Sequence, residues 1–385
     1  MVKRLFKSER GDAAVLITVL FACLIGLTTV IFAATKASAG RSCADAAFRL
    51  AGRSILAEYD TRLYADYGLL AFRGDEQQIE KDLAFYADSA VKTDAAGYNR
   101  FLPLDGGSKM IHLRTEYGAS LKQFSLLDVE LFEAQLHHAV EKKIIAVSED
   151  SGPGFGDTEG EPETARVLRN QAVKEALPSH GYVSSGALDL SDEKISLLAE
   201  VFDSAGAETA ADEYIVSVFG YAHDGVYAEE RFFAREVEYI IAGKESDAAN
   251  YAVVKAYLTT LRDSMNKAAL LADTEKCGII TALAAPFAAE GGAGELAAFE
   301  AITKAWVSAE TRNDIMILED GGRVPFFKNS AQWATLNIEE ILNGAISSTA
   351  EYPADSGGAL YGDYLKALLF LMEREEKLLR VMDLI

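Results

Sequence analysis

The side chains best suited to chemistry fall into short clusters, and the first resembles a metal site. His137, His138 and Glu141 lie within about one turn of a predicted helix. Helical zinc sites use spacings such as HExxH or HxxEH, and neither spacing occurs in this sequence. We therefore interpret the cluster as a solvated helix face, and we expect no bound metal and no other cofactor.

A second cluster contains paired carboxylates, which can act as acid and base in glycosidases. Glu236, Glu238 and Tyr239 precede Gly243, which is placed to end a helix. Carboxylates two positions apart on a helix point to different faces, so a shared site is disfavoured.

A third cluster surrounds Trp306, where Glu310, Arg312 and Asp314 alternate in charge. Opposite charges at these spacings predict a buried ion-pair network rather than a binding site. Nucleophile elbows, phosphate-binding glycine loops and dinucleotide fingerprints are absent from the sequence. We therefore expect no catalytic residues and a protein that is not an enzyme.

The composition limits the partners. The 385 residues include 59 acidic and 37 basic side chains, a formal net charge of -22, which disfavours binding to nucleic acid. A hydrophobic fraction of 50% predicts a folded core. Cys23 lies in an apolar run, and the spacing of Cys43 and Cys277 leaves a disulfide between them open.

The most specific signal is that apolar run. Residues 13–35 contain no charged side chain, and a helix of 23 residues covers the ~30 Å of bilayer hydrocarbon. Four basic residues precede it, so the positive-inside rule places the N-terminus in the cytoplasm and the later residues outside it. The expected membrane anchor includes Ala13, Leu16, Leu20, Leu24 and Ile31.

Two alternatives involve cleavage. Ala37-Ser38-Ala39 fits a signal-peptidase site, although the apolar run exceeds the usual length for a cleaved signal. Gly11 before the run resembles a prepilin leader site, but pilins have a glutamate five residues later, where this chain has Leu16.

Within the run, Ala22 and Gly26 form a small-xxx-small pair that would let two such helices approach closely. A chance pairing in an alanine-rich helix explains them equally well. The expected partners of this helix are membrane lipid and, if the pair does form a contact, a second copy of the chain.

The remaining pattern predicts an α+β, predominantly α fold. The anchor helix continues outward, and strands at 67–72 and 110–117 flank a helix at 76–91, giving a small β-α-β portion. A short hairpin is expected at 315–328, where two apolar runs flank Gly321-Gly322. Further helices are expected at 126–148, 164–176, 192–205, 209–219, 228–242, 247–272, 276–284, 295–312 and 361–385.

This pattern divides the chain into five parts. They are a cytoplasmic basic tail (1–12), a transmembrane helix (13–35), a membrane-proximal α+β portion (36–148), an acidic Gly/Pro linker or loop (149–163) and a helical extracytoplasmic domain (164–385). Asp157, Glu159 and Glu161 in the linker lack the glycine and distal glutamate of a calcium loop, so we interpret them as solvated.

Several stretches together resemble one family. They are Gly11 with the apolar helix, 55–59, 67–72, 235–243, Trp306 with Glu310 and Asp314, 322–328, Tyr364-Leu365 and 382–385. The chain is similar over nearly its whole length to uncharacterised membrane-anchored proteins encoded beside Tad (Flp) pilus genes in Gram-positive bacteria. These are related in layout to the TadE and TadG pseudopilins.

The resemblance implies an accessory structural or assembly component of a Tad-type pilus or related secretion system at the cell envelope. Its expected partners are other pilus-assembly or envelope proteins. The alternative is an extracytoplasmic ligand-binding sensor or enzyme, for which a deep pocket with converging carboxylates and aromatic walls would be the sign.

Overall fold

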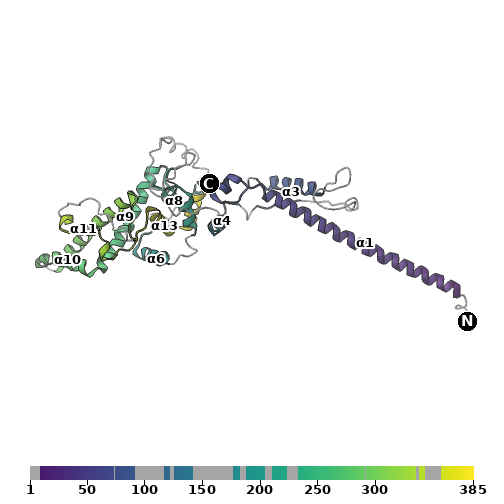
Figure 1. The fold of residues 1–385 in the computed structure, drawn as a ribbon, viewed down its shortest axis with the longest axis horizontal. Helices are drawn as coiled ribbons and strands as arrows, with labels where there is room; N and C mark the ends of the chain where they lie inside the picture. Colours follow the sequence, from purple (N-terminus) through teal and green to yellow (C-terminus); the bar gives the residue numbers. More distant parts are fainter. Residues whose placement is uncertain are drawn as a thin grey trace. The chain divides into compact units, whose positions relative to one another are not determined.

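The computed structural model describes residues 9–72, 74–91, 117–121, 125–141, 177–182, 188–203, 210–222, 233–290, 292–334, 338–342 and 357–385. Throughout these residues the regular structure is helical (Figure 1). The β pairing among them is an isolated antiparallel bridge between Val324 and Ala359. The predicted α+β class is therefore wrong for the described residues, which show no β-α-β portion.

The chain divides into two compact units. Unit 1 comprises Met1–Thr61 and Leu70–Phe124, and unit 2 comprises Arg62–Leu69 and Ser125–Ile385. The helices are α1 (Glu9–Leu56), α2 (Thr61–Tyr67), α3 (Glu76–Val91), α4 (Val129–Glu141), α6 (Asp192–Asp203), α7 (Ala210–Val218), α8 (Glu236–Ala242), α9 (Asp247–Ala272), α10 (Thr274–Ala284), the 3-10 helix η4 (Ala285–Glu290), α11 (Gly292–Glu319), the 3-10 helix η5 (Ser330–Gln332), α12 (Ile338–Leu342), α13 (Tyr361–Leu371) and α14 (Arg374–Met382).

Unit 1 is built on the C-terminal part of α1 packed against α3. Ala51 and Ile55 of α1 meet Ile79, Leu83 and Ala87 of α3 in one buried cluster. The spacing of four positions on each helix aligns these side chains on one face. The predicted helix at 76–91 is thus confirmed as α3.

The first predicted strand is instead a helix end followed by irregular chain. Gly68 has a φ of +66°, and its N–H donates to the carbonyl of Tyr64, which ends α2. Leu69 is fully buried in the helical core of unit 2. A short apolar run satisfies a buried strand and a buried turn equally well, which explains the error. The second predicted strand lies mostly outside the described residues.

The larger core of unit 2 surrounds α13. Tyr364, Leu365 and Leu368 have no exposed surface, and α13 contacts α7, α8 and α9. The predicted helix 361–385 is broken, because α13 ends at Leu371 and α14 begins at Arg374. Both helices contribute to this core, α14 through Leu378 and Val381.

A second core joins the end of α9 to α10, α11 and α12. Leu270, Ile280, Ile302 and Trp306 are buried together in it. The prediction for 247–272 matches α9, which Ser246 caps by accepting a hydrogen bond from the Ala249 N–H.

The predicted hairpin at 315–328 is also wrong, because α11 continues to Glu319. Gly321 has a φ of +76°, its N–H donates to Leu318 O, and the Gly322 N–H donates to Ile317 O at 2.8 Å. These bonds form a Schellman cap, so the two glycines end a helix where a hairpin turn was expected. Ile315 belongs to the buried face of α11.

Of the other predicted helices, 164–176 lies outside the described residues, and 228–242 is described as a helix only in α8. Gly243 ends α8 with a φ of +62°, as its sequence position indicates.

Candidate functional site

The residues predicted to form the anchor lie on α1 and face outward. Leu16, Leu20, Leu24 and Ile31 are 63%, 60%, 59% and 55% exposed, and Ala13 is also exposed. In the described part of the chain, α1 is the one helix long and apolar enough to cross a bilayer. None of its most apolar window is buried, which fits a single membrane span or a signal anchor.

The other positions of interest near the N-terminus also lie on α1. Gly11 and the Ala37-Ser38-Ala39 stretch fall within the helix. Ala22 and Gly26 are exposed, and a Cβ added at Gly26 would meet nothing within 4 Å. This face of α1 is therefore open to a second helix.

The predicted metal-like cluster is placed on α4 but does not converge. Leu136 and Ala139 face the core of unit 2, whereas His138 and Glu141 are exposed. Among the residues with a described position, no group of three or more His, Cys, Asp or Glu side chains is arranged to hold a metal ion.

All three cysteines are free. Cys43 is buried in unit 1, and Cys277 on α10 directs its thiol at the carbonyl of Leu270 at 3.4 Å. The disulfide that the sequence left open is not formed in this structure.

The carboxylates of α8 are both buried, and each accepts a hydrogen bond from the segment that follows α7. Glu236 accepts from the Gly220 N–H at 3.1 Å, and Glu238 accepts from the Ala222 N–H at 2.8 Å. They satisfy separate main-chain donors, so they form no shared acid and base pair. Their structural effect is to fix this loop to α8.

The Glu238 carboxyl is strongly perturbed by its burial. Its Oε1 also accepts from the Tyr361 hydroxyl at 3.1 Å, while Oε2 is buried without a hydrogen-bond partner. Burial raises the pKa of Glu238 to about 7, and the hydrogen bond from Ala222 opposes that rise. The carboxyl has no access to solvent, so it lacks the opening that a substrate would need.

The cluster near Trp306 is a buried ionic network, and its centre is Asp314. The Asp314 carboxylate accepts from Arg262 at 2.8 Å, from Asn266 at 2.8 Å and from Lys328 at 2.6 Å. Lys328 also donates to Glu310. The two cations and two anions all have fully buried side chains. Arg312, the fourth predicted member, is exposed and lies outside the network.

This network joins the chain after α11 to the helices. Arg262 donates to the carbonyls of Pro325 and Phe326 and to the hydroxyl of Tyr364, each at 2.9 Å. Glu310 accepts from the Ala334 N–H at 3.0 Å. Burial lowers the pKa of Lys328, although the charges of Asp314 and Glu310 oppose this effect. The network is closed to solvent, so its role is structural.

Sequence reasoning missed Arg262 and Lys328. For Arg262 a signal existed, because it follows Val254 and Leu258 at intervals of four on the buried face of α9. A charged residue at a core position of an amphipathic helix indicates a buried partner. Lys328 follows two phenylalanines and gave no comparable signal.

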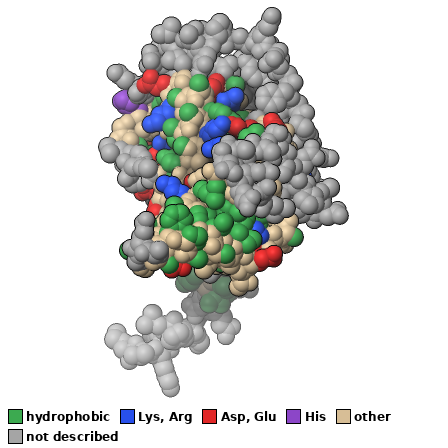
Figure 2. All heavy atoms as spheres, turned by 90° about the vertical axis from the view of Figure 1, so that its left-hand side faces the viewer, with side chains coloured by type: hydrophobic (Ala, Val, Ile, Leu, Met, Phe, Trp, Pro, Cys, Tyr) green, Lys and Arg blue, Asp and Glu red, His purple; other side chains and the backbone are tan. Residues whose placement is uncertain are grey.

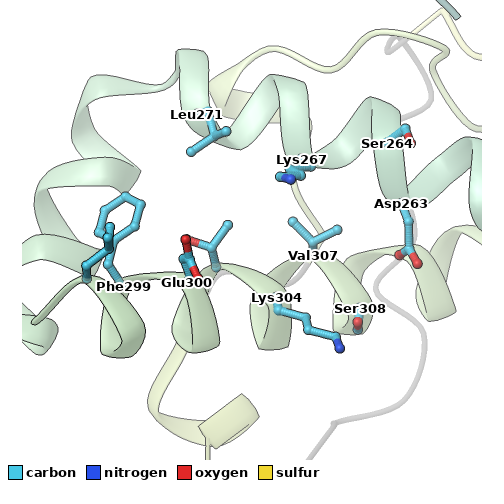
Figure 3. A pocket seen from close by; sticks show the side chains of 11 residues that line it. Asp263, Ser264, Lys267, Leu271, Phe299, Glu300, Lys304, Val307 and Ser308 are labelled. Carbon is cyan, nitrogen blue, oxygen red and sulfur yellow. The ribbon is translucent and has the colours of Figure 1, made fainter. Parts of the chain in front are cut away.

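A groove of about 630 Å³ lies between α9 and α11 in unit 2. Figure 3 shows Leu271 and Phe299 toward one end, Lys267 and Val307 in the middle, and Asp263 with Ser308 at the other end. The volume falls within the ~300–1,000 Å³ that is usual for ligand pockets. The sequence did not predict it, because the groove depends on how two helices pack.

The part of unit 2 that contains α10 and η4 exposes large apolar side chains. Leu271, Ile279, Phe287 and Leu296 are 48%, 40%, 50% and 60% exposed, and they lie on consecutive elements from α9 to α11. Figure 2 shows hydrophobic side chains gathered on this face. Exposed apolar surface of this kind is typical of interaction sites.

Comparison with known proteins gives one family match. Residues 161–385 match a family described as a family of unknown function (DUF5702). No curated protein and no solved structure matches the chain. Because the match covers more than half of the 385 residues, the protein belongs to the family DUF5702.

Proposed function

We propose that this protein is a membrane-anchored, extracytoplasmic structural or assembly protein that acts through contacts with partners. The observation that carries the proposal is the exposed apolar surface of α1, of which Leu20 and Leu24 are the central residues. Apolar surface in water costs about 25 cal/mol per Å², and a bilayer removes that cost. The outer half of α1 packs on α3, so the anchor continues directly into folded protein.

The orientation follows from charge. Basic residues gather before the apolar stretch, which favours a cytoplasmic N-terminus and an extracytoplasmic body. The net charge of -22 suits a solvated body outside the cell. The exposed apolar end of unit 2 provides a surface for contact with other proteins.

We further propose an accessory role in a Tad-type pilus or related secretion system, on the basis of the sequence resemblance. Leu16 stands where pilins have a glutamate, which favours an accessory component over a filament subunit. The proposed partners are membrane lipid and other pilus-assembly or envelope proteins, with self-association through the face that contains Ala22 and Gly26. Catalysis has no part in this proposal, because the buried carboxylates described above are closed to solvent.

The test is membrane fractionation combined with protease treatment of intact cells and N-terminal sequencing. We expect the wild-type chain in the membrane fraction, with its body cut by external protease. Arginine at both Leu20 and Leu24 adds about 6–8 kcal/mol to the insertion cost and should release the chain from the membrane. The matched control places arginine at Phe48 and Leu56, which are 57% and 67% exposed on the outer part of α1. A freely soluble wild-type chain, or one that begins at Gly40, contradicts the anchor.

A test for partners is crosslinking in the membrane, with pilus-assembly proteins as the expected products. Recovery of the wild-type chain without any crosslinked partner contradicts the proposed assembly role.

A ligand-binding role is the second candidate function. The observation that favours it is the groove between α9 and α11.

A further inference from the structure

The core of unit 2 includes two segments that precede the region matched by the family (161–385). They are Arg62–Leu69, which contains most of α2, and the stretch from Ser125 that contains α4. Four of their side chains are at most 1% exposed and belong to the same buried cluster as α7, α13 and α14: Leu69, Phe132, Leu136 and Ala139. The described part of the matched region therefore shares its core with residues outside the match.

The first segment is bound through Tyr67. The hydroxyl of Tyr214 on α7 donates to the Tyr67 carbonyl at 2.6 Å, and the Tyr67 hydroxyl donates to the Leu384 carbonyl at 3.4 Å. The centroid of the Tyr67 ring also lies 5.8 Å from that of Phe219. Leu69, two positions later, has no exposed surface. This segment thus packs on the α7 region and on the C-terminal residues of the chain.

The second segment is bound through one face of α4, which contacts α7 and α14. Phe132, Leu136 and Ala139 recur at intervals of four and three positions, so they share that face. Arg374 at the start of α14 also donates to Glu133 at 2.8 Å. The Arg374 side chain is 55% exposed, so this ion pair adds little, and burial of the apolar face supplies most of the attachment.

The residues from 177 onward are connected to the rest of the chain in two ways. The covalent connection runs through residues 142–176. The second connection is the packing of the two segments, which are joined directly to unit 1 at Thr61 and Phe124. Because unit 1 contains most of α1, this packing connects the matched region to the helix proposed as the anchor.

We propose that residues 62–69 and 125–141 form a docking element that keeps the matched region attached to the anchor when the chain is cut within 142–176. The surface that receives this element lies on α7, α14 and the C-terminal residues. A body outside the cytoplasm is exposed to proteases, and a cut in this stretch leaves it in place. The inference stands on contacts within unit 2, and only its readout on membranes rests on the function proposed above.

The experiment places a recognition sequence for a site-specific protease within 149–163 of the full-length chain. The protein is cut to completion in detergent and reducing buffer, and a denaturing gel verifies the cut. Size-exclusion chromatography in high salt then shows whether the two fragments separate. We expect them to co-elute at the volume of the uncut chain, because the cysteines are free and apolar burial is not screened by salt.

Two pairs of variants place aspartate at buried or exposed positions near the contacts. Leu69→Asp and Leu136→Asp bury a charge in the docking element, and the fraction of fragments that co-elute should fall by about tenfold or more. Leu70→Asp and Leu127→Asp, at positions that are 51% and 66% exposed, are the matched controls and should co-elute as wild type does.

The uncut variants are first compared with wild type by tryptophan fluorescence. Trp306 and Trp333 belong to the second core and not to the docking element, so they report on the fold of the matched region. Where Leu136→Asp alters this signal, Leu136→Ala and Leu127→Ala repeat the comparison with less damage to the fold. The loss of co-elution by Leu136→Ala should then be smaller, but it should still exceed that of its control.

Separation of the wild-type fragments after the cut overturns the proposal, and so does equal co-elution of the buried variants and their controls. On isolated membranes the same cut should leave the matched region in the pellet. Release of both fragments together contradicts the anchor and supports docking, whereas release of the matched region alone contradicts docking. The two proposals therefore fail separately.

Discussion

Replacing Glu238 by glutamine should stabilise the protein progressively, relative to wild type, as pH rises from 4.5 to 8. The carboxyl is fully buried on α8, and only one of its oxygens accepts hydrogen bonds. Glutamine has nearly the same shape, and its oxygen can accept from the Ala222 N–H and the Tyr361 hydroxyl. Its amide nitrogen takes the place of the unpartnered Oε2, which adds a cost that does not change with pH. The substitution therefore removes the titration and keeps the packing.

The magnitude follows from the pKa of Glu238, which burial raises from 4.5 to about 7. Each unit of difference between the folded and unfolded pKa corresponds to 1.36 kcal/mol, so the largest effect is about 3 kcal/mol. The folded state holds its proton more tightly, so stability falls as pH rises from about 4.5 to 7. Below pH 4.5 both states are protonated, and this group adds no pH dependence.

The assay is urea unfolding of the full-length chain in detergent at several pH values from 4.5 to 8, monitored by tryptophan fluorescence. The two tryptophans, Trp306 and Trp333, are buried in unit 2 and report on its unfolding. The free energy of unfolding of wild type is subtracted from that of Glu238→Gln at each pH, which removes the contribution of all other titrating groups.

The expected difference grows by about 3 kcal/mol between pH 4.5 and 8, in favour of the variant. The control Glu275→Gln makes the same chemical change at an exposed position of α10, and the Glu238→Gln difference at pH 8 should exceed the Glu275→Gln difference. A flat difference for Glu238→Gln, or one that grows as pH falls, refutes the reasoning from burial.

Two further substitutions test the network and a helix end by the same unfolding assay. Lys328→Met leaves the buried carboxylates of Glu310 and Asp314 without their ammonium partner and should lower the free energy of unfolding by about 3–5 kcal/mol. The control Arg312→Met, at an exposed site, should change it by less than about 0.5 kcal/mol. Similar losses for both variants would contradict a structural role of the network. Gly243→Ala places a Cβ 2.7 Å from the Arg380 guanidinium at a φ of +62° and should lower the free energy of unfolding by about 1–3 kcal/mol. The control Gly278→Ala in α10, with open space around it, should be neutral or stabilising. Equal effects of the two substitutions would contradict the argument from backbone conformation.

The parts of the fold that were predictable depend on neighbours in sequence. The bounds of α3 and α9 followed from apolar spacing, and the helix end at Gly243 followed from a local cap signal. Such signals act within one or two turns, so a single sequence contains them.

The strands were predicted wrongly because short apolar runs do not specify how they are buried. Residues 67–72 and 315–318 are rich in large apolar side chains, and helix packing buries Leu69, Ile315 and Leu318 of these runs. Gly321 and Gly322 instead form the cap of α11. Consecutive glycines are common both in helix caps and in hairpin turns. Only the packing of distant helices separates these alternatives.

The candidate sites show the same limit and indicate where partners must act. Glu310 and Asp314 were predicted to form ion pairs with Arg312, but their partners are Arg262, 52 positions before Asp314, and Lys328, at the end of the predicted hairpin. Once the fold brings them together, their charges cancel and are closed to solvent, so they are not available for recognition. Large apolar side chains are exposed on α1 and in unit 2 on the elements from α9 to α11. These exposed apolar surfaces are the parts of the described chain best suited to contact with lipid and with partner proteins.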